Sequence, residues 1–264
     1  NTTGTENVAI GSAALYSSNG ANHNAAVGTY ALYSNTTGQS NASLGSFALF
    51  SNTTASSNTA VGYQAGYSNT TGAENVLVGY KAGYSSTTGN GLTAVGRQAL
   101  EDNTASNNTA LGFAVMSNNT TGGFNTALGG ANYGFTGGAM HSNTTGSYNT
   151  ALGNQALHGN TTASNNTAVG YQAGYSQTGA FCASNTFLGR ASGSDTTTGA
   201  LNVFVGDSSG ANQTTGNRNT FLGQSSGESM TTGENNTILG RYNGNQHGLD
   251  IRTSSNNIVL SDGD

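Results

Sequence analysis

The sequence predicts an all-β fold, a parallel β-solenoid (β-roll) of about 14–15 coils. Three observations predict it: a 17-residue repeat, a pair of apolar columns within each repeat, and a very low content of charged residues. The segment NTAVGYQAGYS occurs unchanged at residues 58–68 and 166–176, and similar segments recur along the rest of the chain. A fixed period of this length indicates a stack of similar structural units.

One glycine ends the apolar phrase of each repeat, and we call it the marker glycine. The first six marker glycines are each 17 residues apart, and steps of 16, 24, 19 and 21 residues interrupt the later series. The changes of length fall in the connections, as expected if each repeat is one structural unit. We predict a structural turn at every marker glycine: Gly11, Gly28, Gly45, Gly62, Gly79, Gly96, Gly112, Gly129, Gly153, Gly170, Gly189, Gly206, Gly223 and Gly240.

Two columns precede the marker glycine. The inner column, two residues before it, is mostly alanine and becomes phenylalanine from Phe187 onward. The outer column, one residue before it, is always aliphatic, from Ile10 to Leu239. Neighbouring residues of a strand point to opposite faces, so one column lies inside the coil and the other must be covered by something else.

The rest of the repeat is predicted to be a second short strand, written YQAGY or YQAL, followed by the polar turn SNTTG. Glycine and asparagine in that turn tolerate positive φ. Seventeen residues are too few for a propeller blade, and helical apolar spacing is absent. Coils stacked at about 4.8 Å give a rod about 65–70 Å long.

The columns divide the chain into residues 1–178, with an alanine inner column, and residues 179–264, with a phenylalanine column. The tyrosine column, five residues after the marker glycine, runs from Tyr16 to Tyr175 and becomes Ser194 and then Ala211 in the second part. We predict that the inner phenylalanines fill core space that the tyrosines vacate. The second part is expected to lead into a further C-terminal domain, the chain being a window of a longer polypeptide.

Only 6% of the residues are charged, and the net charge is −5. A stacked column of like charges would repel itself, whereas asparagine and threonine columns can form hydrogen bonds from coil to coil. Six scattered Lys and Arg make no basic stripe for nucleic acid. No apolar run approaches the roughly 20 residues of a membrane span.

A homo-oligomer follows from the thin core. Alanine ladders bury little apolar area against an ordering cost of about 1–2 kcal/mol per residue. Burial of the aliphatic outer column between parallel copies of the chain would relieve this deficit.

The sequence offers no case for an enzyme, a cofactor or a metal site. The single Cys182 is expected to be a small buried hydrophobe, and the four histidines lack paired metal-ligand spacing. Asp250 and Arg252 are expected on an exposed edge. Sequons at the polar turns could accept glycans, but turn chemistry explains them better: Asn35, Asn52, Asn69, Asn119, Asn143 and Asn160.

The phrases NVAIG at 7–11 and NTAVG at 58–62 resemble the repeats of the β-roll head of trimeric autotransporter adhesins. The longer phrase NTAVGYQAGYSNTTG also resembles repeats of phage tail-fibre proteins, and SSNNIVLSDGD at 254–264 is similar to the segment that precedes their C-terminal domain. This resemblance implies a left-handed coil, a homotrimer of intertwined or parallel side-by-side chains, and a role in attachment.

The expected function is the shaft of a trimeric phage tail fibre, extracellular on the virion, which contributes to host attachment. The alternatives are a bacterial cell-surface adhesin head, a self-assembling extracellular filament and, less favoured, an ice- or polysaccharide-binding solenoid. Any receptor, glycan or protein, is expected at the interruptions of the period, because excursions project from a solenoid. The candidate recognition residues are Tyr133, Phe135, Met140, His141 and Phe181.

Overall fold

The computed structural model describes residues 3–131, 137–179 and 181–261. The chain divides into two compact units, Asn1–Asn125 and Thr126–Asp264, and each is described by itself. In both units the described residues form parallel β-solenoid turns with no helix, which confirms the predicted fold class. The change from alanine to phenylalanine in the inner column falls within the second unit, at Phe187.

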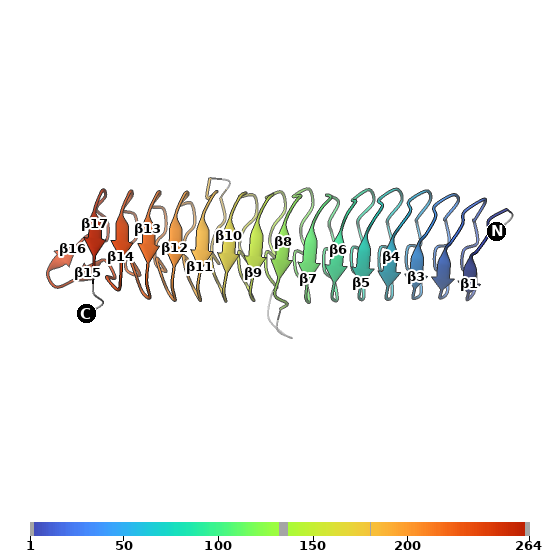
Figure 1. Cartoon of the computed structure of the whole chain (residues 1–264), viewed down its shortest axis with the longest axis horizontal. Coiled ribbons are helices and arrows are strands. Elements are labelled where there is room, and N and C mark those ends of the chain that lie inside the picture. The colour runs from blue at the N-terminus through green and yellow to red at the C-terminus, as the bar shows by residue number, and fades with distance from the viewer. Residues whose placement is uncertain (1–2, 132–136, 180, 262–264) are drawn as a thin grey trace. The chain divides into compact units, whose positions relative to one another are not determined.

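The first unit contains one three-residue strand per turn, and each strand pairs with the next in parallel. The register advances by one repeat at each step, so that Ala25 lies beside Ala42 and Ala42 beside Thr59. Figure 1 shows these strands side by side in chain order, from blue to green. They are β1 (Val8–Ile10), β2 (Ala25–Val27), β3 (Ala42–Leu44), β4 (Thr59–Val61), β5 (Val76–Val78), β6 (Thr93–Val95) and β7 (Thr109–Leu111).

The second unit repeats this arrangement and absorbs the longer steps between its strands. Thr126 pairs with Thr150 across the 24-residue step, and Thr167 pairs with Thr186 across the 19-residue step. The pairing therefore keeps its register while the connections change length. The parallel strands are β8 (Thr126–Leu128), β9 (Thr150–Leu152), β10 (Thr167–Val169), β11 (Thr186–Leu188), β12 (Val203–Val205), β13 (Thr220–Leu222), β14 (Thr237–Leu239) and β17 (Ile258–Leu260).

The marker glycine bends the chain after each strand. Gly62, for example, has a φ of 133°, which side-chain-bearing residues rarely adopt. A Cβ atom built on Gly62 would lie 2.5 Å from the carbonyl oxygen of Gly79 in the next turn. The column therefore needs glycine for two reasons, the backbone conformation and the close approach of stacked turns.

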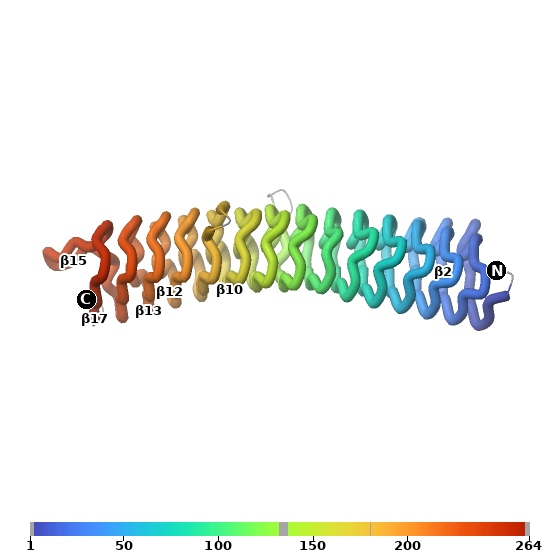
Figure 2. Tube along the Cα trace, turned by 90° about the horizontal axis from the view of Figure 1, so that it is seen from above, coloured from blue at the N-terminus to red at the C-terminus, as the bar shows by residue number. Residues whose placement is uncertain are grey.

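The predicted second strand is wrong. After the marker glycine, the residues two and four places on adopt left-handed backbone angles, such as Tyr30 (φ 56°) and Leu32 (φ 50°). This alternation folds the segment into a tight turn, which Figure 2 shows as the sinuous path between strands. Its backbone bonds to the next turn instead, as where the Leu32 N–H donates to the Ala48 carbonyl at 3.0 Å.

The two predicted columns do lie on opposite faces. Inner-column residues such as Ala26 and Phe204 are fully buried within the turns. Outer-column residues point away from the core, and Leu44 remains 51% exposed. Each unit therefore has a buried inner column and an aliphatic row on its surface.

The predicted exchange of volume between phenylalanine and tyrosine is also wrong. Tyr16 is 67% exposed and Tyr33 is half-buried, whereas Phe187, Phe204 and Phe221 are fully buried. The two columns lie in separate environments and share no core space. Another column, which we call the leucine column, lies four residues after the marker glycine and compensates for the inner column.

Leucine or methionine occupies the leucine column where the inner residue is small, as with Ala26 and Leu32. Glycine replaces it where the inner residue of the same turn or of the following turn is large. A Cβ atom on Gly210 would lie 2.6 Å from the ring of Phe204 in its own turn, and one on Gly66 would lie 2.7 Å from the Leu77 side chain in the next turn. The core volume is thus shared between neighbouring turns.

Two buried asparagine ladders fasten neighbouring turns. One is formed by the asparagine that begins the apolar phrase, a place that Leu92 takes in one turn: the Asn41 backbone N–H donates to Asn24 Oδ1 at 2.9 Å. The other, the turn-asparagine column, lies seven residues after the marker glycine. Asn52 Nδ2 donates to Asn35 Oδ1 at 2.8 Å and to the Ala55 carbonyl at 3.1 Å. The predicted coil-to-coil bonding of asparagine is confirmed.

The sequon asparagines are members of the turn-asparagine column, and their side chains are buried. Their amides already donate to turn carbonyls, as Asn69 Nδ2 does to Gly72 at 2.9 Å. A folded turn therefore does not present these amides to a glycosylating enzyme. The fully buried sequon residues are Asn35, Asn52, Asn69, Asn119, Asn143 and Asn160.

The 21-residue step contains an antiparallel hairpin that sequence reasoning missed. Its strands, β15 (Asn245–Gln246) and β16 (Leu249–Asp250), are joined by His247 and Gly248. Both joining residues have positive φ, 51° and 83°, as a two-residue hairpin turn requires. The dipeptide His-Gly between short polar stretches was the available signal.

Candidate functional site

An outward stripe of the strands is the most extensive apolar feature of each unit. It consists of the residues one and three places before the marker glycine, which share the solvent face of the sheet. In the first unit Ile10, Leu44 and Leu111 are 59%, 51% and 43% exposed. In the second unit Leu128 and Leu188 are 43% and 40% exposed. The outer column is therefore partly exposed in both units.

Threonine lines the second column of the same stripe, which sequence reasoning overlooked. Thr150, Thr167 and Thr186 are register partners on neighbouring strands, and each side chain stands beside an aliphatic residue two places on. The strand motif Thr-x-Val/Leu, recurring at the repeat period, was the missed signal.

The tyrosine column of the first unit forms a stacked aromatic ladder. The rings of Tyr33, Phe50 and Tyr67 follow one another at centroid distances of 5.2 and 5.1 Å, with interplanar angles of 7°. Lys81 Nζ lies 4.9 Å from the ring centroid of Tyr84, the last rung. Because the ring faces are stacked against one another, the ladder stabilises the turns and offers mainly ring edges to a ligand.

The residues predicted for surface recognition lie in different environments. Tyr133 and Phe135 lie outside the described residues. Met140 is fully buried in the leucine column, and His141 occupies the tyrosine column, stacked 5.7 Å from His158. Phe181 is 85% exposed and is the candidate that the structure leaves open to a partner.

Cys182 is buried beside the exposed Phe181, as expected for a small hydrophobe. Its Sγ donates to the Gly179 carbonyl at 2.7 Å. Burial raises the pKa of the Cys182 thiol, which disfavours the reactive thiolate.

The four histidines do not form a single site, but two of them meet. His141 and His158 stack, and His158 stacks in turn on Tyr175 at 5.0 Å. Among residues 3–131, 137–179 and 181–261, no cluster of three His, Cys, Asp or Glu side chains has the geometry to hold a metal ion.

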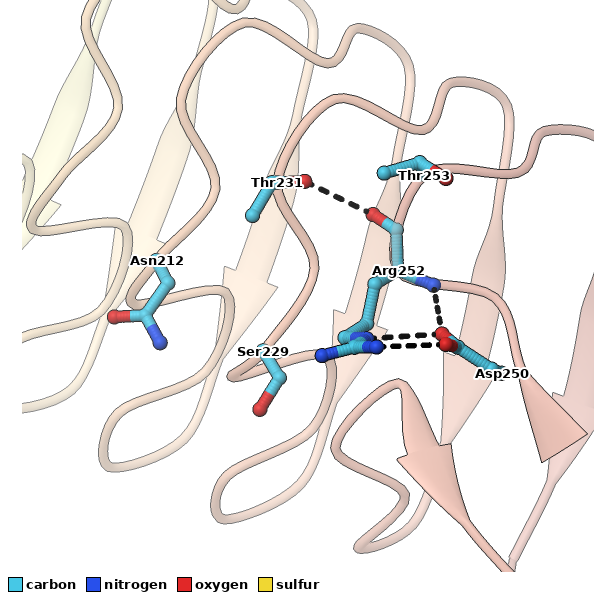
Figure 3. A pocket seen from close by; sticks show the side chains of 6 residues that line it. All are labelled: Asn212, Ser229, Thr231, Asp250, Arg252 and Thr253. Carbon is cyan, nitrogen blue, oxygen red and sulfur yellow. Dashed lines mark hydrogen bonds and ion pairs between the residues drawn. The ribbon is translucent and has the colours of Figure 1, made fainter. Parts of the chain in front are cut away.

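A polar groove of about 510 Å³ lies beside the missed hairpin in the second unit. Figure 3 shows side chains from three successive turns around it. The residues that line it are Asn212, Ser229, Thr231, Asp250, Arg252 and Thr253.

Arg252 and Asp250 form a two-pronged ion pair at the edge of the groove. Arg252 Nε and Nη2 donate to the Asp250 carboxylate at 3.0 and 2.7 Å, and the Arg252 backbone N–H donates to it at 3.1 Å. These hydrogen bonds lower the pKa of the Asp250 carboxyl and raise the pKa of the Arg252 guanidinium. The predicted exposed position of both residues is confirmed, since each side chain is about half exposed.

A membrane-spanning helix is not found in the part of the chain that the structure describes. Comparison with known proteins found no match to this chain among protein families, curated proteins or solved structures.

Proposed function

We propose that the chain is the shaft of a trimeric attachment fibre, most simply the tail fibre of a phage. The observation that carries the proposal is the outward stripe, a regular aliphatic row on a chain with few charges. Soluble monomers rarely leave such a contiguous apolar surface uncovered. Parallel copies arranged around an axis would bring identical columns together at equal height.

The interior of each turn suits a mechanical role. Within each unit, backbone ladders, buried asparagine bonds and stacked cores join neighbouring turns, so that force is shared along many equivalent contacts. The threefold symmetry, the left-handed winding and the extracellular location on a virion belong to this proposal, and the sequence resemblance supports them.

Measurement of the oligomeric state tests the stripe. The unmodified chain is expected to sediment as a trimer at micromolar concentration. Leu44→Asp, which places a charge in the stripe, is expected to shift the population strongly to monomer, because the carboxylate would be buried unpaired. Thr37→Asp is the matched control at an exposed polar turn and should remain trimeric. A monomeric or dimeric unmodified chain would contradict the proposal.

Electron microscopy separates the shaft from its closest alternatives. Particles with one end fixed to a capsid support a fibre, particles fixed to a bacterial surface support an adhesin, and indefinitely long assemblies support a filament.

The threonine column favours ice or polysaccharide-lattice binding as a second candidate. A row of threonines beside a row of aliphatic residues repeats at strand spacing in the second unit. This use of the stripe requires that it stay uncovered, so it competes directly with trimerisation. A monomer that shows thermal hysteresis would favour the second candidate, and a trimer without it would remove it.

A further inference from the structure

We infer that the polar groove beside the hairpin is a binding site for a neutral saccharide. The inference adds recognition to the proposed shaft but stands on the groove's own geometry. It does not require the chain to be trimeric.

The groove arises where a regular surface row meets the irregular last turn. Asn212 and Ser229 are both six residues after their marker glycines and stand in neighbouring turns. Thr231 continues the adjacent row two residues on. In the next turn the hairpin replaces these rows, and Arg252 closes the end of the groove (Figure 3). The pocket is therefore a consequence of one four-residue lengthening of the repeat.

The hairpin that closes the groove is firmly held. The Tyr242 hydroxyl donates to the Leu249 carbonyl at 2.7 Å, and the Ile251 N–H donates to the Gly244 carbonyl at 2.8 Å. Tyr242 and Ile251 are both buried. The Thr231 N–H donates to the Arg252 carbonyl at 2.9 Å, which fixes the closing residue to the preceding turn. Because these contacts already order the hairpin, a ligand would not have to pay the entropy of ordering it on binding.

Several hydrogen-bonding groups in the groove are free to serve a ligand. Within the described residues, the side-chain amide of Asn212, the Ser229 hydroxyl and Arg252 Nη1 form no hydrogen bond, whereas the Asn212 backbone N–H donates to the Glu228 carbonyl. Figure 3 shows the guanidinium of Arg252 on the side of Ser229, between it and Asp250. Together they offer donors, an amide acceptor and a hydroxyl that can do either.

This set of groups matches sugar hydroxyls, each of which donates one hydrogen bond and accepts others. Arg252 and Asp250 neutralise each other, so the groove carries no net charge toward an ionic ligand. A neutral saccharide therefore fits better than a uronic or sialic acid. Among the residues that the structure describes, no aromatic ring lines the groove, so we expect weak binding, with a Kd of about 1 mM.

Titration of the whole chain with sugars, followed by NMR or calorimetry, tests the site. The panel contains glucose, galactose, mannose, N-acetylglucosamine and short oligomers of each, with glucuronic and N-acetylneuraminic acids as charged probes. At least one neutral sugar is expected to bind. Asn212→Ala, which disturbs no bond of the hairpin, should weaken that binding roughly threefold, and Arg252→Gln roughly tenfold.

Arg190→Gln is the matched control, because it breaks a comparable exposed pair, Arg190 with Asp207, in a regular turn of the same unit. It should leave sugar binding unchanged. Absence of binding by the unmodified chain, binding of the charged sugars alone, or equal binding by Asn212→Ala would each overturn the inference. Sedimentation of the same samples keeps this result separate from the proposed shaft, since a trimer that binds no sugar removes only the site.

Discussion

The turns with a small inner residue and the turns with a large one solve the same packing problem in different ways. A small inner residue such as Ala26 is accompanied by Leu32 in the leucine column, and a large one such as Phe204 is accompanied by Gly210. The comparison teaches that a large inner side chain is matched by glycine in the leucine column and that the surface tyrosines take no part. It also extends to the preceding turn, since a Cβ atom on Gly174 would lie 2.6 Å from the ring of Phe187.

The largest expected effect comes from breaking the compensation in one turn. Gly83→Leu should lower the free energy of unfolding by more than about 3 kcal/mol, because the new side chain would enter the space of Leu77. Leu77→Ala alone should cost about 2–5 kcal/mol by leaving a cavity. The double variant recreates the small-residue arrangement and should cost no more than about 1–2 kcal/mol.

Urea unfolding of the three variants forms a double-mutant cycle with the unmodified chain. A favourable coupling of at least about 3 kcal/mol is expected. Additive losses would show that the two columns do not share volume.

A smaller effect should distinguish the two kinds of turn at the turn-asparagine column. Asn52 bonds to both neighbouring turns, and its replacement by methionine should cost about 2–3 kcal/mol by leaving buried partners unpaired. Gln213 occupies the same column in a large-residue turn, its Oε1 has no hydrogen-bond partner among the described residues, and Met230 follows it in the next turn. Gln213→Met should therefore cost less than about 1 kcal/mol. Equal losses in thermal unfolding would refute the distinction.

The smallest effect is expected at the surface ladder. Tyr67 stacks between Phe50 and Tyr84, and Tyr67→Ser should cost about 1 kcal/mol. The large-residue turns already carry Ser194 in this column, where its Oγ donates to Ala211. Ser194→Ala is the control and should change the melting temperature less than Tyr67→Ser does. A loss at Tyr67 as large as that of Leu77→Ala would mean that the ladder belongs to the core.

The repeat period and the column faces could be predicted because every turn repeats the same local choices. The marker glycine and the buried asparagines are also readable, since each column stays constant over many turns. The predicted second strand is wrong because its apolar residues suit a strand by type. In the structure, left-handed backbone angles at Tyr30 and Leu32 let the adjacent side chains of Ala31 and Leu32 both point inward. Hydrogen bonds to the next turn, such as that from the Leu32 N–H to the Ala48 carbonyl, stabilise these backbone angles.

The groove was beyond prediction for a different reason. Asn212 and Ser229 look like ordinary members of a polar column, and only the fold of the last turn brings Arg252 beside them. The sequence predicts an exposed position for Asp250 and Arg252, but only the hairpin places them beside the groove. A site built by an irregular turn leaves little trace in a periodic sequence.

The identical sequences of residues 58–68 and 166–176 create a risk of mispaired turns during folding. A turn that is chemically equal to another can stack on the wrong neighbour, and a slip by one whole repeat loses almost no local contact. The shortened connection at 101–106 and the hairpin at Asn245–Asp250 differ from every other turn. Because these irregular turns do not match a regular turn, they disfavour stacking in a register shifted by one repeat. The same mismatch would disfavour a shifted register between two copies of the chain.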